Sequence, residues 1–115
     1  MDLTVLVYAL TSEFPKSEIY GLSSQMRRAA VSIASNIAEG SARNSKKDFR
    51  QFVTIARGSN WELQTQFLIA GRLGYSTVEK MREAEVLCHE VARMLNGLSQ
   101  FLEAKSTPPP LTTKN

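Results

Sequence analysis

Apolar side chains recur at intervals of three and four residues along most of this 115-residue chain. That spacing is typical of amphipathic α-helices, and no segment shows the strict alternation expected of a β-strand. Pro15 and the prolines at 108–110 leave a long proline-free stretch between them, which also favours helix. The pattern predicts four helices, at about 2–12, from position 17 or 21 to 40, at 45–74, and from 76 to about 105.

Residues that commonly start or end helices lie at the edges of these segments. Ser45 with Asp48, and Ser76 with Glu79, have the spacing of a capping box, in which side chains satisfy free backbone amides at a helix start. Gly40 is expected to end the second helix as a left-handed cap. These residues predict short connections between the helices.

Short connections between helices make consecutive helices antiparallel, so we expect an all-α fold, an antiparallel up-down-up-down four-helix bundle over residues 1–105. The polar, proline-rich segment 106–115 is expected to be a disordered tail. One apolar stripe on each helix should form the shared core. The expected core residues are Leu3, Leu6, Val7, Leu10, Phe14, Leu22, Met26, Ala29, Ala30, Ile33, Ile37, Phe49, Phe52, Val53, Ala56, Leu63, Phe67, Ala70, Val78, Met81, Leu87 or Cys88, Val91, Leu95, Leu98 and Leu102.

Positive charge is concentrated in one part of the chain, although the formal net charge is only +3. Seven basic residues and two acidic residues lie between Arg27 and Arg57. Such a cluster attracts phosphate groups, but it is also compatible with an ordinary solvated surface. The candidate nucleic-acid-binding residues are Arg27, Arg28, Arg43, Lys46, Lys47, Arg50 and Arg57.

Few residues are suited to catalysis or metal binding. His89 and Cys88 are the only histidine and the only cysteine. Neighbours on a helix point about 100° apart, so they cannot share a metal ion or act as a nucleophile–base pair. No phosphate-binding loop or dinucleotide fingerprint is present. We therefore expect no enzymatic activity, no catalytic residues, no bound metal and no cofactor.

Two further features concern packing. Glu39 and Glu62 interrupt small or apolar runs, and a structural ion pair with Arg28 would explain them. Trp61 and Leu68 lie off the main stripe of the third predicted helix, which makes this helix apolar on more than one face. They are the expected oligomer interface.

Three motifs in the chain resemble one known family. They are FP-x-x-E-x-YGL at 14–22, QxRRAAxSIxxNIAEG at 25–40 and GSxxEL at 58–63. Their combination is similar to the four-helix bundle proteins encoded in intervening sequences of bacterial 23S ribosomal RNA genes, and the similarity covers roughly residues 8–102. The positions that match the family are Arg27, Arg28, Asn36, Glu39, Gly40, Arg43, Gly58, Ser59 and Glu62.

The resemblance implies a fold and a set of partners. Known members form homopentameric rings, so the resemblance implies that this chain forms a homo-oligomer, a pentamer. Relatives that serve diversity-generating retroelements bind a reverse transcriptase and nucleic acid, so it also implies these partners. The resulting expectation is a non-enzymatic, oligomeric bundle that binds RNA or another nucleic acid through its basic surface. The alternative is a protein-interaction scaffold that does not bind nucleic acid directly.

The cellular setting follows from composition. A single cysteine cannot form an intrachain disulfide and suits a reducing, cytoplasmic location. No apolar run approaches the roughly 20 residues of a membrane-spanning helix, so no membrane association is expected.

Overall fold

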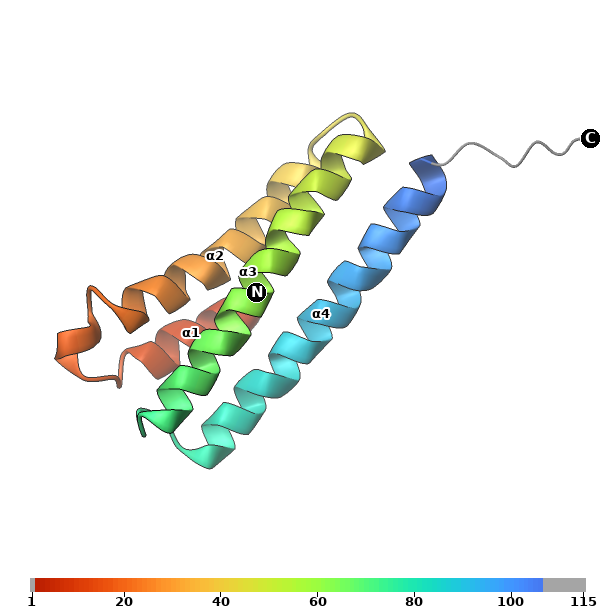
Figure 1. The fold of residues 1–115 in the computed structure, drawn as a ribbon. Coiled ribbons are helices and arrows are strands. Elements are labelled where there is room, and N and C mark those ends of the chain that lie inside the picture. The colour runs from red at the N-terminus through yellow and green to blue at the C-terminus, as the bar shows by residue number, and fades with distance from the viewer. Residues whose placement is uncertain (1, 107–115) are drawn as a thin grey trace, which may run out of the picture.

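The computed structural model describes residues 2–106, with side chains described through Glu103. Within that range the chain is helical and contains no strand. Its elements are α1 (Asp2–Thr11), the short 3₁₀ helix η1 (Lys16–Glu18), α2 (Leu22–Ser41), α3 (Lys46–Arg72) and α4 (Val78–Ser106). Figure 1 shows α2, α3 and α4 side by side, with the chain reversing direction at each connection. The predicted helical bundle is confirmed, and the tail predicted at 106–115 lies outside the described residues apart from the last residue of α4.

The core lies where the apolar stripes of the four helices meet, as the helical periodicity predicted. Met26 and Ile33 of α2, Leu63 of α3 and Leu95 of α4 are fully buried in it. Most other expected core residues are buried or packed against this cluster. Val78 is an exception: it begins α4 and is 75% exposed.

Two polar contacts join the long helices inside this largely apolar interface. The hydroxyls of Ser32 on α2 and Ser59 on α3 lie 2.8 Å apart in a hydrogen bond. The Asn60 side-chain amide donates to the backbone carbonyl of Cys88 on α4, at 3.1 Å. Buried hydrogen bonds depend on geometry, so these two contacts favour one register of α3 against its neighbours.

Gly40 does not end α2, which corrects one sequence-based expectation. The helix continues through Ser41. Among the described residues, the one with a positive φ is Gly74, which follows α3 and has a φ of 75°. Gly40 is buried where the α2 backbone approaches α3, and a Cβ built there would lie 2.8 Å from atoms of both Phe49 and Phe52. Its small size therefore serves close helix packing.

The predicted caps are confirmed at one helix and shifted at another. The Ser45 hydroxyl accepts a hydrogen bond from the Asp48 amide at the start of α3. At α4 the cap is Thr77, whose hydroxyl accepts from the Lys80 amide at 3.2 Å, so the prediction of Ser76 was wrong by one residue.

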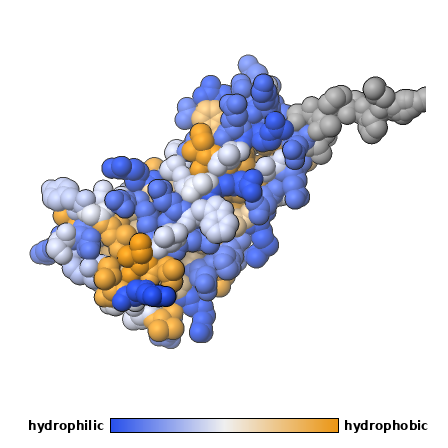
Figure 2. All heavy atoms as spheres, in the orientation of Figure 1, coloured by the Kyte–Doolittle hydropathy of each residue, from blue (hydrophilic) through white to orange (hydrophobic). Residues whose placement is uncertain are grey.

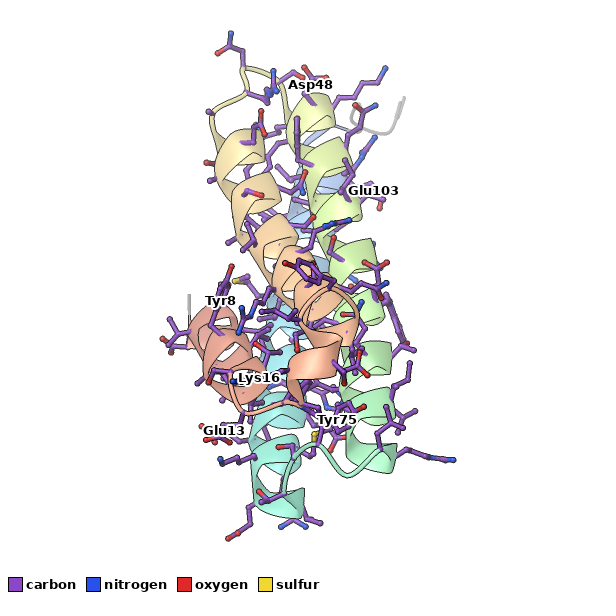
Figure 3. All side chains as sticks on the ribbon, turned by 90° about the vertical axis from the view of Figure 1, so that its left-hand side faces the viewer. Tyr8, Glu13, Lys16, Asp48, Tyr75 and Glu103 are labelled. Carbon is purple, nitrogen blue, oxygen red and sulfur yellow. The ribbon has the colours of Figure 1, made fainter. Side chains whose placement is uncertain are left out.

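The segment between α1 and α2 is held at the end of the bundle that contains the α3–α4 turn. Glu18 accepts hydrogen bonds from the Leu22 amide at 3.0 Å and from the Tyr75 hydroxyl at 2.8 Å. The Lys80 ammonium lies 2.7 Å from a Glu13 carboxylate oxygen. Figure 3 shows Glu13, Lys16 and Tyr75 near this end, and Asp48 at the opposite end.

Because of these contacts, we expect protonation of the Glu18 carboxylate at acidic pH to lower the free energy of unfolding. The Leu22 amide and then the Tyr75 hydroxyl lower the pKa of Glu18 below its ordinary value. A lowered folded-state pKa contributes stability above the unfolded-state pKa, and this is lost as the pH falls through the folded-state value. Urea unfolding at pH 6 and pH 3 should therefore show a smaller acid-induced loss for Glu18→Gln than for the wild type. Equal losses would contradict this role of Glu18.

α1 covers only part of the bundle. It spans 10 residues, whereas α4 spans 29. The Thr4 hydroxyl reaches the Ala30 carbonyl and Arg27 reaches Thr11, so α1 lies along the first half of α2. The second half of α2 and the C-terminal half of α4 extend beyond it (Figure 1).

No helix within residues 2–106 is both long enough and apolar enough to span a bilayer.

Candidate nucleic-acid interface

Four basic side chains gather at the end of the bundle where α2 connects to α3. Arg43 lies in the connection, Lys46 and Lys47 open α3, and Arg50 lies one turn further along. The side chains of Lys46 and Lys47 are exposed. Free amides at the start of a helix carry partial positive charge, so the α3 N-terminus adds to the positive potential here. We call these four residues the basic end.

Arg43 is held in place by two neighbours. Its guanidinium lies 3.5 Å from a carboxylate oxygen of Glu39 and 4.7 Å from the ring centroid of Phe52. The ion pair with Glu39 is solvent-exposed, and such pairs contribute only about 0–1 kcal/mol. Arg43 thus keeps a solvent-facing charge on a side chain whose position is restricted.

Arg27 belongs to the packing of α1 on α2. Its Nε donates to the Thr11 hydroxyl at 2.7 Å, and its guanidinium lies 4.9 Å from the Tyr8 ring centroid. The side chain is only partly exposed. Although Arg27 was grouped with the nucleic-acid-binding candidates, the structure gives it a structural role between two helices.

The remaining candidates lie away from the basic end. Arg28 is exposed on α2 and precedes Arg43 by 15 residues, about 22 Å at 1.5 Å per helical residue. Arg57 is half-buried on α3, seven residues after Arg50. The structure therefore divides the seven basic candidates into the basic end, Arg57 further along α3, and the α2 pair Arg27 and Arg28.

Sequence analysis predicted that Arg28 forms an ion pair with Glu39 or Glu62, and the prediction for Glu39 is wrong. Arg28 and Glu39 share a face of α2 but lie 11 residues apart, about 16 Å along the axis, which is beyond the reach of the side chains. Glu39 pairs with Arg43 instead. Glu62 is exposed, and no ion pair joins it to Arg28 among the described side chains.

The Cys88 thiol is not an activated nucleophile. It is fully buried between α3 and α4, and this burial raises its pKa to about 12. The thiol is therefore protonated at neutral pH, whereas nucleophilic cysteines need a depressed pKa. His89 is exposed on the next position of the helix, and no group of residues suited to a metal ion occurs within the described part of the chain.

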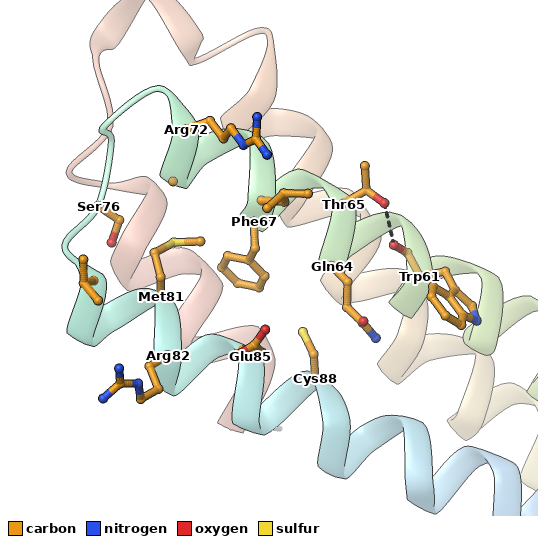
Figure 4. Close-up of a pocket in the computed structure, with 13 residues that line it drawn as sticks. Trp61, Gln64, Thr65, Phe67, Arg72, Ser76, Met81, Arg82, Glu85 and Cys88 are labelled. Atoms are coloured by element: carbon orange, nitrogen blue, oxygen red, sulfur yellow. Dashed lines mark hydrogen bonds between the residues drawn. The ribbon is translucent and has the colours of Figure 1, made fainter.

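A pocket of about 660 Å³ lies between the C-terminal half of α3 and the first half of α4. Figure 4 shows Phe67 and Met81 facing each other inside it, with Trp61 at one end. Sequence periodicity gave no signal for this pocket, because its shape depends on how far the two helices separate. Its lining residues are Trp61, Gln64, Thr65, Phe67, Leu68, Gly71, Arg72, Ser76, Val78, Met81, Arg82, Glu85 and Cys88.

Trp61 and Leu68, the expected interface residues, are both exposed, at 68% and 60%. Apolar atoms gather over the C-terminal part of α3 in Figure 2, where Leu68, Ile69 and Leu73 are exposed. Exposure is what an interface residue shows in a single subunit, so their placement in an oligomer interface stays a prediction.

Comparison with known proteins identifies a matching family and a solved structure of similar fold. A family model described as 23S rRNA-intervening sequence protein matches residues 1–97. A crystal structure of a protein of unknown function from the S23 ribosomal protein family of Bacteroides thetaiotaomicron VPI-5482 is similar in fold, with a TM-score of 0.80 and 22% identity over 86% of this chain and 93% of that one. A search of curated proteins found no match. Because the family model spans most of the chain, this protein belongs to the 23S rRNA-intervening sequence protein family.

Proposed function

We propose that this protein binds RNA without catalysis, through the basic end. The observation that carries the proposal is the concentration of charge there: the basic end holds four basic residues against two acidic ones, Asp48 and the Glu39 that pairs with Arg43, a net of +2. The whole chain has a net charge of +3, so most of its excess positive charge lies at this end. A localised positive field is what phosphate backbones recognise.

The geometry of the basic end supports phosphate contacts rather than recognition of a small ligand. Its side chains project from a helix start and a short connection, and Lys46 and Lys47 are exposed. Contacts to phosphates fix position and supply affinity but carry little sequence information. The expected interaction is therefore salt-sensitive and tolerant of sequence.

Reversing charge at the basic end tests the proposal. Lys46→Glu with Lys47→Glu should weaken binding to a fluorescein-labelled fragment of ribosomal RNA about tenfold or more in an anisotropy titration at fixed salt. The matched control is Lys16→Glu with Arg93→Glu, which changes the net charge equally at two exposed sites away from the basic end. Equal losses in both double variants would show that only overall charge matters, and no binding by the wild type would refute the proposal.

Self-association is a second proposal, and the short α1 is the observation that favours it. Met94 lies seven residues, two turns, beyond Leu87, which borders α1. Met94 therefore continues the α1-facing stripe past the part that α1 covers, and it is 49% exposed. Leu98, four residues further along the same helix, is only partly buried. We propose that a second copy of the chain covers this apolar face, which would also let several basic ends bind one RNA with increased avidity.

Sedimentation at micromolar concentration tests the second proposal. The wild type should sediment as a multiple of 12.8 kDa, and Met94→Glu should shift the population towards the single-chain mass because it places a charge in the contact. Arg93→Glu, at the adjacent position, is the control and should leave the mass unchanged. A single 12.8 kDa species for the wild type at every concentration would contradict self-association.

A further inference from the structure

One face of α3 combines arginines with the chain's only tryptophan. Counted from Arg50, the residues Arg57, Trp61 and Arg72 follow at 7, 11 and 22 positions. These intervals are about 1.9, 3.1 and 6.1 helical turns, each close to a whole number. The four side chains therefore emerge on one side of α3, in a row that starts at the basic end.

Trp61 is placed to receive a flat ligand. Its side chain is 68% exposed, at one end of the pocket between α3 and α4 (Figure 4). Gly58 lies three residues earlier on the same side of the helix, and no atom lies within 4 Å of the position its Cβ would occupy. Space therefore remains beside the indole ring.

The pocket that Trp61 borders suits a nucleotide better than an apolar peptide. Gln64 lies beside Trp61, and Arg82 on α4 lines the same pocket. At the end opposite Trp61, Arg72 also lines the pocket, and the buried Ser76 hydroxyl has no hydrogen-bond partner among the described residues (Figure 4). A volume of about 660 Å³ falls within the range of roughly 300–1,000 Å³ typical of small-molecule sites.

We propose that the RNA is bound as a single strand along this face of α3, with one base stacked on Trp61, the phosphate beside that base near Arg57, and phosphates further along the strand near Arg72 and Arg82. This inference rests on the proposed function and specifies its substrate class. Single-strand-binding proteins combine cationic grooves with exposed aromatic rings, because every base presents a π-face once it is unpaired. In a duplex the bases are already stacked and cannot reach the indole ring.

Glu85 is the one acidic residue in the pocket lining. Its carboxylate repels phosphate, so the backbone of the strand should follow the arginines of the rim. A carboxylate accepts hydrogen bonds from exocyclic amino groups, which gives Glu85 a place against the edge of an inserted base.

The fluorescence of Trp61 provides a direct test. Adding a 12-nucleotide single-stranded RNA should quench the emission of the wild-type protein, whereas the matching duplex should leave it nearly unchanged. In anisotropy titrations with the same labelled strand, Trp61→Ala should weaken binding about tenfold. Trp61→Phe, which keeps an aromatic face, should lose less affinity than Trp61→Ala. Affinity for the duplex should be the same in all three proteins.

The outcomes separate this inference from the proposed function. If the wild type binds RNA, is weakened by Lys46→Glu with Lys47→Glu, and yet shows no quenching and no effect of Trp61→Ala, the stacking site is wrong and the basic end stands. If the wild type binds neither strand nor duplex, both proposals fail. If Trp61 emission changes on dilution without RNA and Trp61→Ala lowers the sedimenting mass, Trp61 belongs to a subunit interface and the inference is overturned. Because Trp61 is largely exposed, its variants should retain the wild-type circular dichroism spectrum.

Discussion

Leu63→Ala is expected to lower the free energy of unfolding by about 3 kcal/mol, within the range of roughly 2–5 kcal/mol for truncated core leucines. Leu63 is fully buried near the middle of α3, among side chains from the other helices. Its truncation removes apolar contacts and leaves a cavity that the rigid helices close only in part. The loss is a large fraction of the 5–15 kcal/mol that stabilises most domains. Urea unfolding followed by circular dichroism measures it.

Leu68→Ala is the matched control, since it makes the same substitution five residues later on the same helix. Leu68 is 60% exposed, so its truncation should change the free energy of unfolding by less than about 0.5 kcal/mol. Comparable losses at Leu63 and Leu68 would mean that the assigned core face of α3 is wrong.

Gly40→Val is expected to cost about 2 kcal/mol, because it overpacks the contact between α2 and α3. The added side chain would meet the Cβ of Phe52 and a ring carbon of Phe49, each 2.8 Å from the new Cβ. The Phe52 Cβ is fixed to the α3 backbone, so the two helices must move apart. Thermal or urea unfolding would show the loss despite the better helix propensity of valine.

Gly97→Val provides the control for that substitution. Gly97 lies inside α4, and no atom comes within 4 Å of the position of its Cβ. Valine there gains some helix propensity without a clash, so stability should rise by a few tenths of a kcal/mol. The free energy of unfolding should therefore fall in Gly40→Val and rise in Gly97→Val. A neutral or stabilising Gly40→Val would rule out the close approach of α2 to α3 at Gly40.

The helices and most of the core could be predicted because they depend on periodicity within each segment. The stripe on α2, for example, needs only the three- and four-residue spacing from Met26 to Ile33. Gly40 was mispredicted because glycine is compatible with a helix interior and with a left-handed cap. Its conformation is decided by Phe49 and Phe52, which reach it from another helix.

The candidate site was harder to predict because contacts between helices divide its charged residues. Sequence grouped Arg27 with the basic end, but Tyr8 and Thr11 of α1 engage it. Arg28 and Glu39 lie on one face of α2, but their separation of 11 residues corresponds to about 16 Å along a helix, so the sequence alone was enough to exclude this ion pair. The pocket beside Trp61 depends on the separation of α3 and α4, which has no counterpart in the sequence pattern.

The salt dependence of RNA binding tests the central claim most directly. If the basic end binds phosphates, the logarithm of the association constant should fall linearly with the logarithm of salt concentration, by about 0.7 per phosphate contact on a single strand. The slope should become shallower by one to two contacts in the protein carrying Lys46→Glu and Lys47→Glu. Binding that is insensitive to salt, or a slope that these substitutions leave unchanged, would contradict the assignment of the basic end as the RNA-binding surface.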